Sequence, residues 1–359
     1  MLLNVPFIPD PQYAAFLSVF GRQIFAVHFS LNDPQLGDAR VRLQKTDIQS
    51  LISLLQALPG PKKYLLANGR FHPTRSYDAT GATHALRRPL ESLLAAGVVD
   101  GLIFSDPYLL LSLSDAAPDL AARLEAVPSV NFAIDSLQKL AAVHDLVRQS
   151  RFRMPQKICL DRGLNRRPQA LADLVSAARP RWPETKFEVL VNEGCLPHCP
   201  FRPTHEALIA AANTGFGVDS LRLNRDLGCM RILSESPYRI FASPFIRPED
   251  MTRYGDAVDI FKISGRTLGR PFLMQTVAAY SAQRYNGNLL DLLDASHWMA
   301  AKWEIPNPQL PEDFFDRLTG CDQLCRNCTR CRDLFQRLAR PRPFVLPDLH
   351  PPGSRSEGA

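Results

Sequence analysis

The sequence lacks the long apolar runs and the leader that would direct it into a membrane or out of the cell. No stretch approaches the roughly 18–20 uninterrupted apolar residues of a membrane span. The N-terminus reaches Pro6 and Asp10 without a basic region or a sufficient apolar core, so it does not resemble a signal peptide. We therefore expect a soluble, cytoplasmic chain without a membrane span, in which clustered cysteines stay reduced and bind metal.

The common catalytic signatures are also missing. The sequence contains no Gly-x-Ser-x-Gly, His-Glu-x-x-His or P-loop pattern, and no Gly-x-Gly-x-x-Gly follows the first predicted strand. It therefore offers no visible apparatus for the familiar hydrolase, NTPase or dinucleotide-dependent mechanisms. Charge is nearly balanced, since 42 Lys and Arg against 36 Asp and Glu leave +6 over 359 residues. Without a basic stripe, this balance gives little support to an RNA partner.

What the sequence does have is a regular alternation of short apolar runs with amphipathic segments. The segments with apolar residues at three- and four-residue spacing are Leu86–Ala96, Ser136–Val147, Pro168–Ala178 and Thr204–Asn213. The runs predicted to be strands are Ile24–Ser30, Tyr64–Ala67, Gly101–Phe104, Val130–Ala133, Lys157–Leu160, Phe187–Val191, Ser220–Leu223, Ile240–Ala242 and Ile260–Ile263. Strands that alternate with helices predict parallel βαβ units.

This alternation predicts an α/β protein with a TIM-like (β/α)8 barrel and a C-terminal, cysteine-rich helical extension. Eight or nine units within about 240 residues suit a closed barrel, and an open doubly wound sheet is the alternative. We assign residues 1–265 to the barrel and 266–339 to the extension, with helices at Arg266–Arg284 and Leu289–Lys302. Residues 340–359 form a Pro-rich tail that we expect to be disordered.

The eight cysteines fall into groups, and the first group follows a predicted strand. Cys195 and Cys199 lie in the loop NEGCLPHCPFR, whose glycine and prolines keep the backbone irregular and free to point N–H groups at sulfur. Radical-SAM enzymes use C-x3-C-x2-C, but Arg202 stands at the third cysteine's place, which argues against SAM chemistry. Cys229 is the obvious third ligand. Cys159, within the apolar run KICL, is interpreted as a buried strand residue.

The second group is denser. Cys321, Cys325, Cys328 and Cys331 lie within eleven residues, and their spacing is closer to ferredoxin ligation than to the paired Cys-x2-Cys of structural zinc. We predict a 4Fe–4S cluster, with zinc as the alternative. The seven grouped cysteines allow one cluster or two, and the division is open. Either a C-terminal cysteine completes the first group, or the C-terminal cluster is fully ligated and the first group keeps an open iron.

Polar residues follow most of the predicted strands, where a barrel carries its site. From these positions we select Asp161, Lys262 and Arg266 as candidate catalytic residues, and His205, close to Cys199, as a candidate ligand or proton donor. Basic side chains at strand ends could together bind a carboxylate or phosphate. Each of these residues taken singly also has a plain structural interpretation, as a loop, helix-start or salt-bridge residue.

Three segments resemble a known family. The run VDIFKISGR (258–266) resembles the last-strand signature of the peptidase U32, or collagenase-like peptidase, family, and the segments DRGLNR (161–166) and NEGCLPHCPFRPTH (192–205) fit a divergent branch of it. The resemblance covers roughly residues 21–284 and is most specific at Lys262, Gly265 and Arg266. It implies a TIM-like barrel with a 4Fe–4S cluster held by four cysteines at the mouth.

The resemblance also implies an activity. Despite the peptidase name, better-understood members of the family take part in oxygen-independent hydroxylation of ubiquinone precursors or RNA bases, with prephenate implicated as oxygen source. This sequence departs from them in the short spacing of Cys195 and Cys199 and in the added C-terminal cysteine group. Both departures leave the substrate open.

These observations predict an iron–sulfur oxidoreductase of the U32-like class. Its substrate would be a small molecule, quinone precursor or peptide, and an electron donor and a protein partner are expected. The alternatives are a U32-type peptidase and a non-catalytic iron–sulfur subunit that acts only with a partner chain.

Overall fold

Eight parallel strands form the centre of the molecule in the computed structural model, which describes residues 1–33, 35–36, 38–40, 45–78, 82–217 and 219–343. The strands are β1 (Leu2–Pro6), β2 (Ile24–Phe29), β3 (Lys62–Ala67), β4 (Gly101–Phe104), β5 (Glu125–Pro128), β6 (Lys157–Cys159), β7 (Lys186–Leu190) and β8 (Ile260–Lys262). They pair in the order β5-β4-β3-β2-β1-β8-β7-β6.

The two ends of this sheet meet, which makes it a nearly closed barrel. Just before β6, Arg153 donates its N–H to Leu124 O at 2.9 Å, and Arg153 O accepts from Ala126 N at 3.1 Å. Through these bonds the start of β5 pairs with the segment that leads into β6. The predicted TIM-like (β/α)8 barrel is therefore confirmed.

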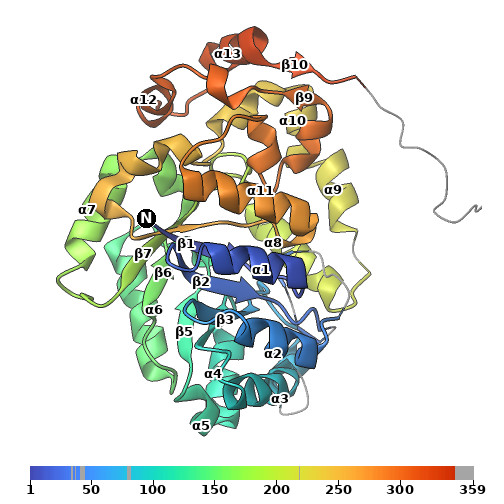
Figure 1. Cartoon of the computed structure of the whole chain (residues 1–359), viewed down its shortest axis with the longest axis vertical. Coiled ribbons are helices and arrows are strands. Elements are labelled where there is room, and N and C mark those ends of the chain that lie inside the picture. Colours follow the sequence, from blue (N-terminus) through green and yellow to red (C-terminus); the bar gives the residue numbers. More distant parts are fainter. Residues whose placement is uncertain (34, 37, 41–44, 79–81, 218, 344–359) are drawn as a thin grey trace, which may run out of the picture.

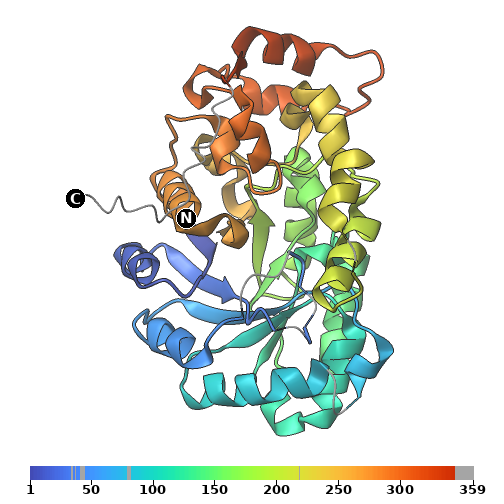
Figure 2. The ribbon, with the colours of Figure 1, turned by 90° about the vertical axis from the view of Figure 1, so that its right-hand side faces the viewer.

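Each barrel strand is followed by at least one helix, and together the helices surround the strands (Figures 1 and 2). The helices are α1 (Pro11–Val19), α2 (Ile48–Gln56), α3 (Ala82–Ala95), α4 (Pro107–Ala116), α5 (Pro118–Ala121), α6 (Leu137–Gln149), α7 (Pro168–Ala178), α8 (Arg202–Asn213), α9 (Ser220–Asp226), α10 (Cys229–Glu235), α11 (Gly269–Ala282), α12 (Phe314–Thr319) and α13 (Arg330–Leu338). Figure 2 shows α8–α10, in yellow, running along one side from the barrel toward the extension.

Alternation along the strands separates a helix-facing side from the barrel interior. In β7, Phe187 and Val189 belong to the large apolar core shared with the helices, whereas Glu188 between them points the other way. There it meets Lys157 of β6 and Lys262 of β8. The short strands thus place charged side chains inside the barrel, just below its carboxyl end.

Three predicted strands are wrong. The strand near Val130–Ala133 lies earlier, at Glu125–Pro128, and a 3-10 turn occupies Val130–Phe132. Ser220–Leu223 begins helix α9, because Asp219 accepts a hydrogen bond from Arg222 N at 2.8 Å and so caps a helix. Ile240–Ala242 lies in a 3-10 helix. The first strand, β1, was not predicted at all, although it is the strand that links β2 to β8.

The C-terminal part departs from the prediction in its helices. The predicted helix Leu289–Lys302 is instead two 3-10 turns, Leu289–Leu292 and His297–Ala301. Asn288 explains the break, because its side chain accepts from Leu290 N at 3.3 Å and Ile305 N at 2.8 Å, tying the chain to the segment that follows β9 (Trp303–Glu304).

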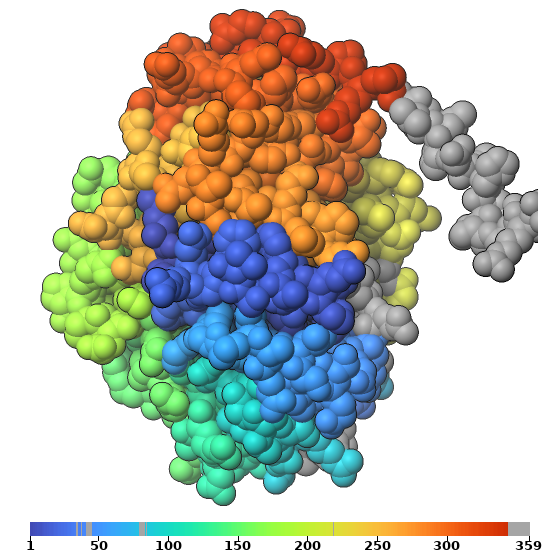
Figure 3. Space-filling view, viewed as in Figure 1, coloured from blue at the N-terminus to red at the C-terminus, as the bar shows by residue number. Residues whose placement is uncertain are grey.

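The region assigned to the extension has two kinds of packing. Helix α11 contributes Phe272, Leu273, Val277 and Tyr280 to the barrel core, so the first part of this region packs as a barrel helix. A second core, with Phe241, Phe314 and Phe335 among its members, joins the later segments. Helices α12 and α13 lie above α11 in Figure 1, and in Figure 3 the red C-terminal residues cover the top of the molecule above the orange segments. The boundary after Gly265 stays a prediction.

The tail meets the structure only at its start. Arg340–Pro341 forms strand β10, antiparallel to β9, and residues 344–359 of the predicted disordered tail lie outside the described residues. In the part of the chain that the structure describes, no helix has the length and apolar character to cross a membrane.

Candidate functional site

Arginine and glutamate side chains face one another where the barrel strands end. Glu193, just after β7, forms a buried ion pair with Arg162, just after β6. Arg40, beyond β2, lies 3.6 Å from Glu193 and 2.7 Å from Asp294 (Nη2 to carboxylate oxygen in each case). Carboxyl ends of parallel strands meet at one face of a barrel, which is why residues so distant in sequence are neighbours.

A second glutamate completes this group, which we call the mouth cluster: Arg40, Arg70, Arg162, Glu193 and Glu206. Glu206, on helix α8, lies 3.7 Å from Arg70 and 3.9 Å from Arg162. Burial raises the pKa of Glu206 despite Arg162 and Arg70. Burial also opposes ionisation of Glu193, but Arg162, Arg202 and Arg40 overcome it and hold the pKa of Glu193 below its usual value.

No sequence pattern selects Glu206 or Arg40. Glu206 stands within a helix rather than at a strand end, and its only signal was its position beside the selected His205. Arg40 lies ten residues beyond Ser30, the nearest predicted strand end. The folded barrel brings Glu206 to Arg162 and Arg40 to Glu193.

The loop after β7 carries Cys195 into this network. At the preceding residue, Gly194, a Cβ atom would stand 1.7 Å from Ser296 Oγ, so only glycine fits there. The backbone is fixed further by Ser243 Oγ, which donates to Cys195 O at 2.6 Å. Burial and then the charge of Glu193 raise the pKa of the Cys195 thiol. Cys195 therefore faces the mouth cluster.

Cys199 and Cys229 are neighbours of each other and pack against the second core. Burial raises the pKa of the Cys229 thiol, a hydrogen bond to Asn224 lowers it, and Cys199 raises it again. The Cys229 Sγ lies 3.2 Å from Asn224 Oδ1. The structure thus brings together two of the three cysteines in the predicted first group, with Cys195 turned toward Glu193.

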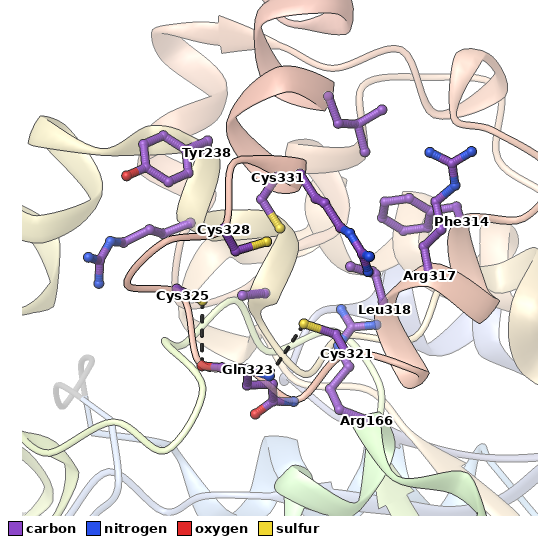
Figure 4. A pocket seen from close by; sticks show the side chains of 14 residues that line it. Arg166, Tyr238, Phe314, Arg317, Leu318, Cys321, Gln323, Cys325, Cys328 and Cys331 are labelled. Atoms are coloured by element: carbon purple, nitrogen blue, oxygen red, sulfur yellow. Dashed lines mark hydrogen bonds between the residues drawn. The ribbon is translucent and has the colours of Figure 1, made fainter.

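The four C-terminal cysteines line one cavity, shown in Figure 4. It encloses about 930 Å3, part of it open to solvent, between α12, α13 and the 3-10 helix Pro237–Ala242. Burial and then the other three cysteines raise the pKa of Cys331 to about 11, while Arg166 lowers it. Thiols that raise one another's pKa are close together, and a bound cation would relieve that repulsion.

The chemistry of the donors fits a thiolate-bound metal centre. All eight cysteines are free thiols, and Cys159 is buried in the barrel as predicted. As the side chains stand, no three His, Cys, Asp or Glu residues among those described lie close enough together to hold an ion. The four C-terminal thiols nevertheless line one cavity.

The four predicted catalytic residues lie in separate contacts. Lys262 Nζ is 3.5 Å from Glu188 inside the barrel, and Arg266 pairs with Asp38. Asp161 accepts from Gly163 N at 2.7 Å and so caps a 3-10 turn. His205 lines a groove between α8 and α9, and burial followed by Arg40 lowers its pKa. The structure therefore does not gather them into one constellation.

The cysteine cavity and the barrel mouth share a wall. Arg166 and Gln323 line the cavity and also a small recess bordered by Asp161, Arg162 and Arg202. The buried guanidinium of Arg166 donates from Nε to Ser243 O at 2.8 Å, and the Ser243 hydroxyl in turn holds the Cys195 carbonyl. One continuous set of contacts therefore leads from the C-terminal cysteines to the loop at the mouth.

Comparison with known proteins places the chain in a family, although no family model matches it. It is 31% identical over 312 residues to an uncharacterized protease of Methanocaldococcus jannaschii, covering 84% of this chain and 85% of that protein. A solved U32 peptidase shares 18% identity at a TM-score of 0.48, over 74% of this chain and 94% of its own. The carboxyl transferase domain of Rhizobium etli pyruvate carboxylase shares 9% sequence identity at a TM-score of 0.37. The match covers 89% of this chain and 46% of that one. Because of its similarity to the Methanocaldococcus jannaschii protein over most of both chains, the chain belongs to the peptidase U32 family.

Proposed function

We propose that this chain is an iron–sulfur oxidoreductase, acting by oxygen-independent hydroxylation or a related modification of a small molecule, quinone precursor or peptide. The observation that carries the proposal is the set of four free thiols around one cavity, which shares the lining residues Arg166 and Gln323 with the recess at the barrel mouth. A redox centre needs this proximity to act on a substrate in the mouth.

In this proposal Cys321, Cys325, Cys328 and Cys331 hold a 4Fe–4S cluster, which supplies one-electron chemistry when bound. Their spacing is of the ferredoxin kind, and the buried cation of Arg166 offsets the negative charge that thiolates and cluster bring. Cys195, Cys199 and Cys229 form the second ligand group, whose three cysteines leave room for a ligand from elsewhere.

The mouth cluster binds and orients the substrate. Arg70 is the most exposed member, with a side chain 36% accessible, and Arg162 and Glu193 behind it are nearly buried. An arginine at the opening over a buried arginine–glutamate pair suits a substrate with a carboxylate or other anionic group. Replacement of Arg70 by Met is expected to weaken substrate binding and leave metal content unchanged.

The test is the metal content of protein purified without oxygen. We expect a brown protein containing iron and acid-labile sulfide, with an electron paramagnetic resonance signal after reduction. The double variant Cys328→Ser/Cys331→Ser should lose the C-terminal centre, and Cys195→Ser/Cys199→Ser should lose the other. Cys159→Ala is the matched control, because this thiol is buried inside the barrel and should leave the iron content unchanged. A colourless protein with stoichiometric zinc would contradict the proposal.

A peptidase is the second candidate, favoured by the name of the relative from Methanocaldococcus jannaschii. Proteolysis that persists in iron-free Cys195→Ala/Cys199→Ala protein would support it over the oxidoreductase. A third candidate, a non-catalytic subunit, would be supported if cluster-loaded protein acted only after co-expression with a second chain.

A further inference from the structure

The segment that carries the C-terminal cysteines is rich in arginine. Residues 314–343 contain seven arginines, no lysine and three aspartates, a formal +4. The cysteine cavity therefore lies in a basic part of the chain.

Three of these arginines, Arg326, Arg330 and Arg332, are exposed, and within the described residues none forms an ion pair. The nearest acids in sequence are Asp322, which accepts from Leu324 N at 2.9 Å, and Asp333, which accepts from Thr329 Oγ1 at 2.7 Å and supports the charge of Arg332. Surface arginines elsewhere, such as the Arg87–Glu91 pair, are compensated.

The same segment carries an exposed apolar residue. Leu324 is 77% exposed on the loop between Cys321 and Cys325, and Cys325 and Cys328 are exposed beside it. Arg332 is held in place by Tyr238, whose ring its guanidinium covers at 5.0 Å and whose hydroxyl it contacts at 3.2 Å. A small apolar spot on a basic segment is typical of transient, electrostatically guided docking.

The same loop leads inward. Gln323, next to Leu324, lines both the cysteine cavity and the recess at the mouth, and its N–H donates to Cys321 Sγ at 3.3 Å. One side of the loop therefore faces solvent with Leu324, and the other side borders the site where the proposed chemistry takes place.

We propose that this surface, formed by Leu324, Arg326, Arg330 and Arg332, docks an acidic one-electron carrier protein of the ferredoxin class. The inference rests on the proposed iron–sulfur function. On docking, the reduced carrier loses one electron and the centre held by the four cysteines gains it, and no bond forms or breaks. The negative surface of such a carrier complements the three exposed arginines, and the exposed thiols bring its donor close to the acceptor.

The test is binding of a strongly acidic plant-type [2Fe–2S] ferredoxin to the anaerobically purified full chain, measured by calorimetry at 50 and 300 mM salt. Arg326→Glu/Arg330→Glu/Arg332→Glu should weaken binding by about tenfold or more and remove most of its salt dependence. The matched control reverses the same charge at Arg123, Arg151 and Arg153, which are exposed near α5 and the start of β6, at the opposite end of the molecule from α13 (Figure 1). It should bind within about twofold of the parent.

Reduction kinetics separate this inference from the proposed function. In stopped-flow absorbance, the triple variant should be reduced slowly by ferredoxin and at the parental rate by dithionite. Protein without iron would defeat the proposed function itself. Iron-loaded protein that dithionite reduces, but that ferredoxin neither binds nor reduces, would overturn the docking surface alone. Equal loss in the control triple variant, or RNA that binds this face and displaces ferredoxin, would also overturn it.

Discussion

The barrel interior and the cysteine-rich extension both contain charged groups, but among the described residues these are paired in the barrel and largely unpaired around the C-terminal cysteines. Inside the barrel, Glu188 meets Lys157 at 3.0 Å, Lys262 at 3.5 Å and the amide of Asn4 at 2.6 Å, all buried. In the extension, thiols crowd one another and arginines stand unpaired. The barrel pairs its own charges, whereas the extension, in the part that the structure describes, leaves thiols next to one another and arginines without an ion pair, the groups on which the proposed metal centre and docking surface depend.

Packing follows the same division. The barrel core continues through all eight strands and the helices around them, so its stability comes from the folded chain itself. The segment 320–329 has neither helix nor strand, and α13 buries only Leu334 and Phe335. A short segment with so little buried apolar surface is of the kind that a bound metal normally stabilises.

The largest effect on the free energy of unfolding is expected when Glu188, the buried carboxylate inside the barrel, is removed. Glu188→Gln leaves Lys157 and Lys262 without their carboxylate, and a buried charge stripped of its partner typically costs about 3–5 kcal/mol of the free energy of unfolding. Urea denaturation of the parent and the variant measures the difference.

An exposed pair provides the control for Glu188. Glu91→Gln breaks the solvent-exposed Arg87–Glu91 pair and should cost no more than about 0.5 kcal/mol. Equal losses in the two variants would mean that the barrel interior is no more dependent on its charge pairing than the surface.

A second, somewhat smaller effect concerns the helical layer around the barrel. His144 of α6 is buried, its ring stacks on Trp182 at 4.3 Å, and neither ring nitrogen has a hydrogen-bond partner among the described residues. Burial, followed by Arg148, lowers the pKa of His144 to about 4. The folded state therefore binds the proton less readily than the unfolded chain, whose pKa is near 6.5.

The sign of the pH dependence follows directly. The contribution of His144 is fully present above pH 6.5 and is lost as the pH falls from 6.5 toward 4, by roughly 2–3 kcal/mol. His144→Phe, which keeps the stacking on Trp182, should flatten this part of the stability curve in urea titrations from pH 7 to 4. An unchanged slope would show that the pKa of His144 is the same in the folded and unfolded states.

The smallest effect is expected where the two regions meet. Gly194→Ala places a methyl group against Ser296, and overpacking of this kind should cost about 1–2 kcal/mol and disturb the loop that carries Cys195. Ser296→Gly should restore part of the stability and of the iron content, because it removes the two closest atoms. Gly21→Ala, where a Cβ would meet nothing nearer than 3.4 Å, should leave the melting temperature and iron content as they are.

Much of the barrel was accessible from the sequence because its signal is local. The strands β2, β3, β4, β6, β7 and β8 coincide with short apolar runs, and α7 begins and ends at the predicted residues. Errors arose where an apolar run serves something other than the barrel. Leu221 and Leu223 are exposed on α9, and Ile240 and Phe241 pack in the second core as a 3-10 helix.

The site was harder to predict, because a strand-end position does not say what a side chain contacts. Lys262, selected as a basic residue at a strand end, pairs with Glu188 inside the barrel. Glu206 and Arg40, which no strand-end rule selects, belong to the mouth cluster. Distances between residues far apart in sequence depend on closure of the sheet, which no local pattern contains.

By itself the sequence determined the βαβ alternation, the family and the two groups of cysteines, since each is written in periodicity or spacing along the chain. The tertiary structure alone decided that the four C-terminal thiols share a cavity, that Arg166 and Gln323 join this cavity to the mouth, and that Glu193 and Glu206 meet on Arg162. The reason is physical. Burial and charge pairing depend on which segments the closed barrel and the second core bring together. The lack of long apolar runs and of familiar motifs excludes classes of protein, but it does not predict these contacts.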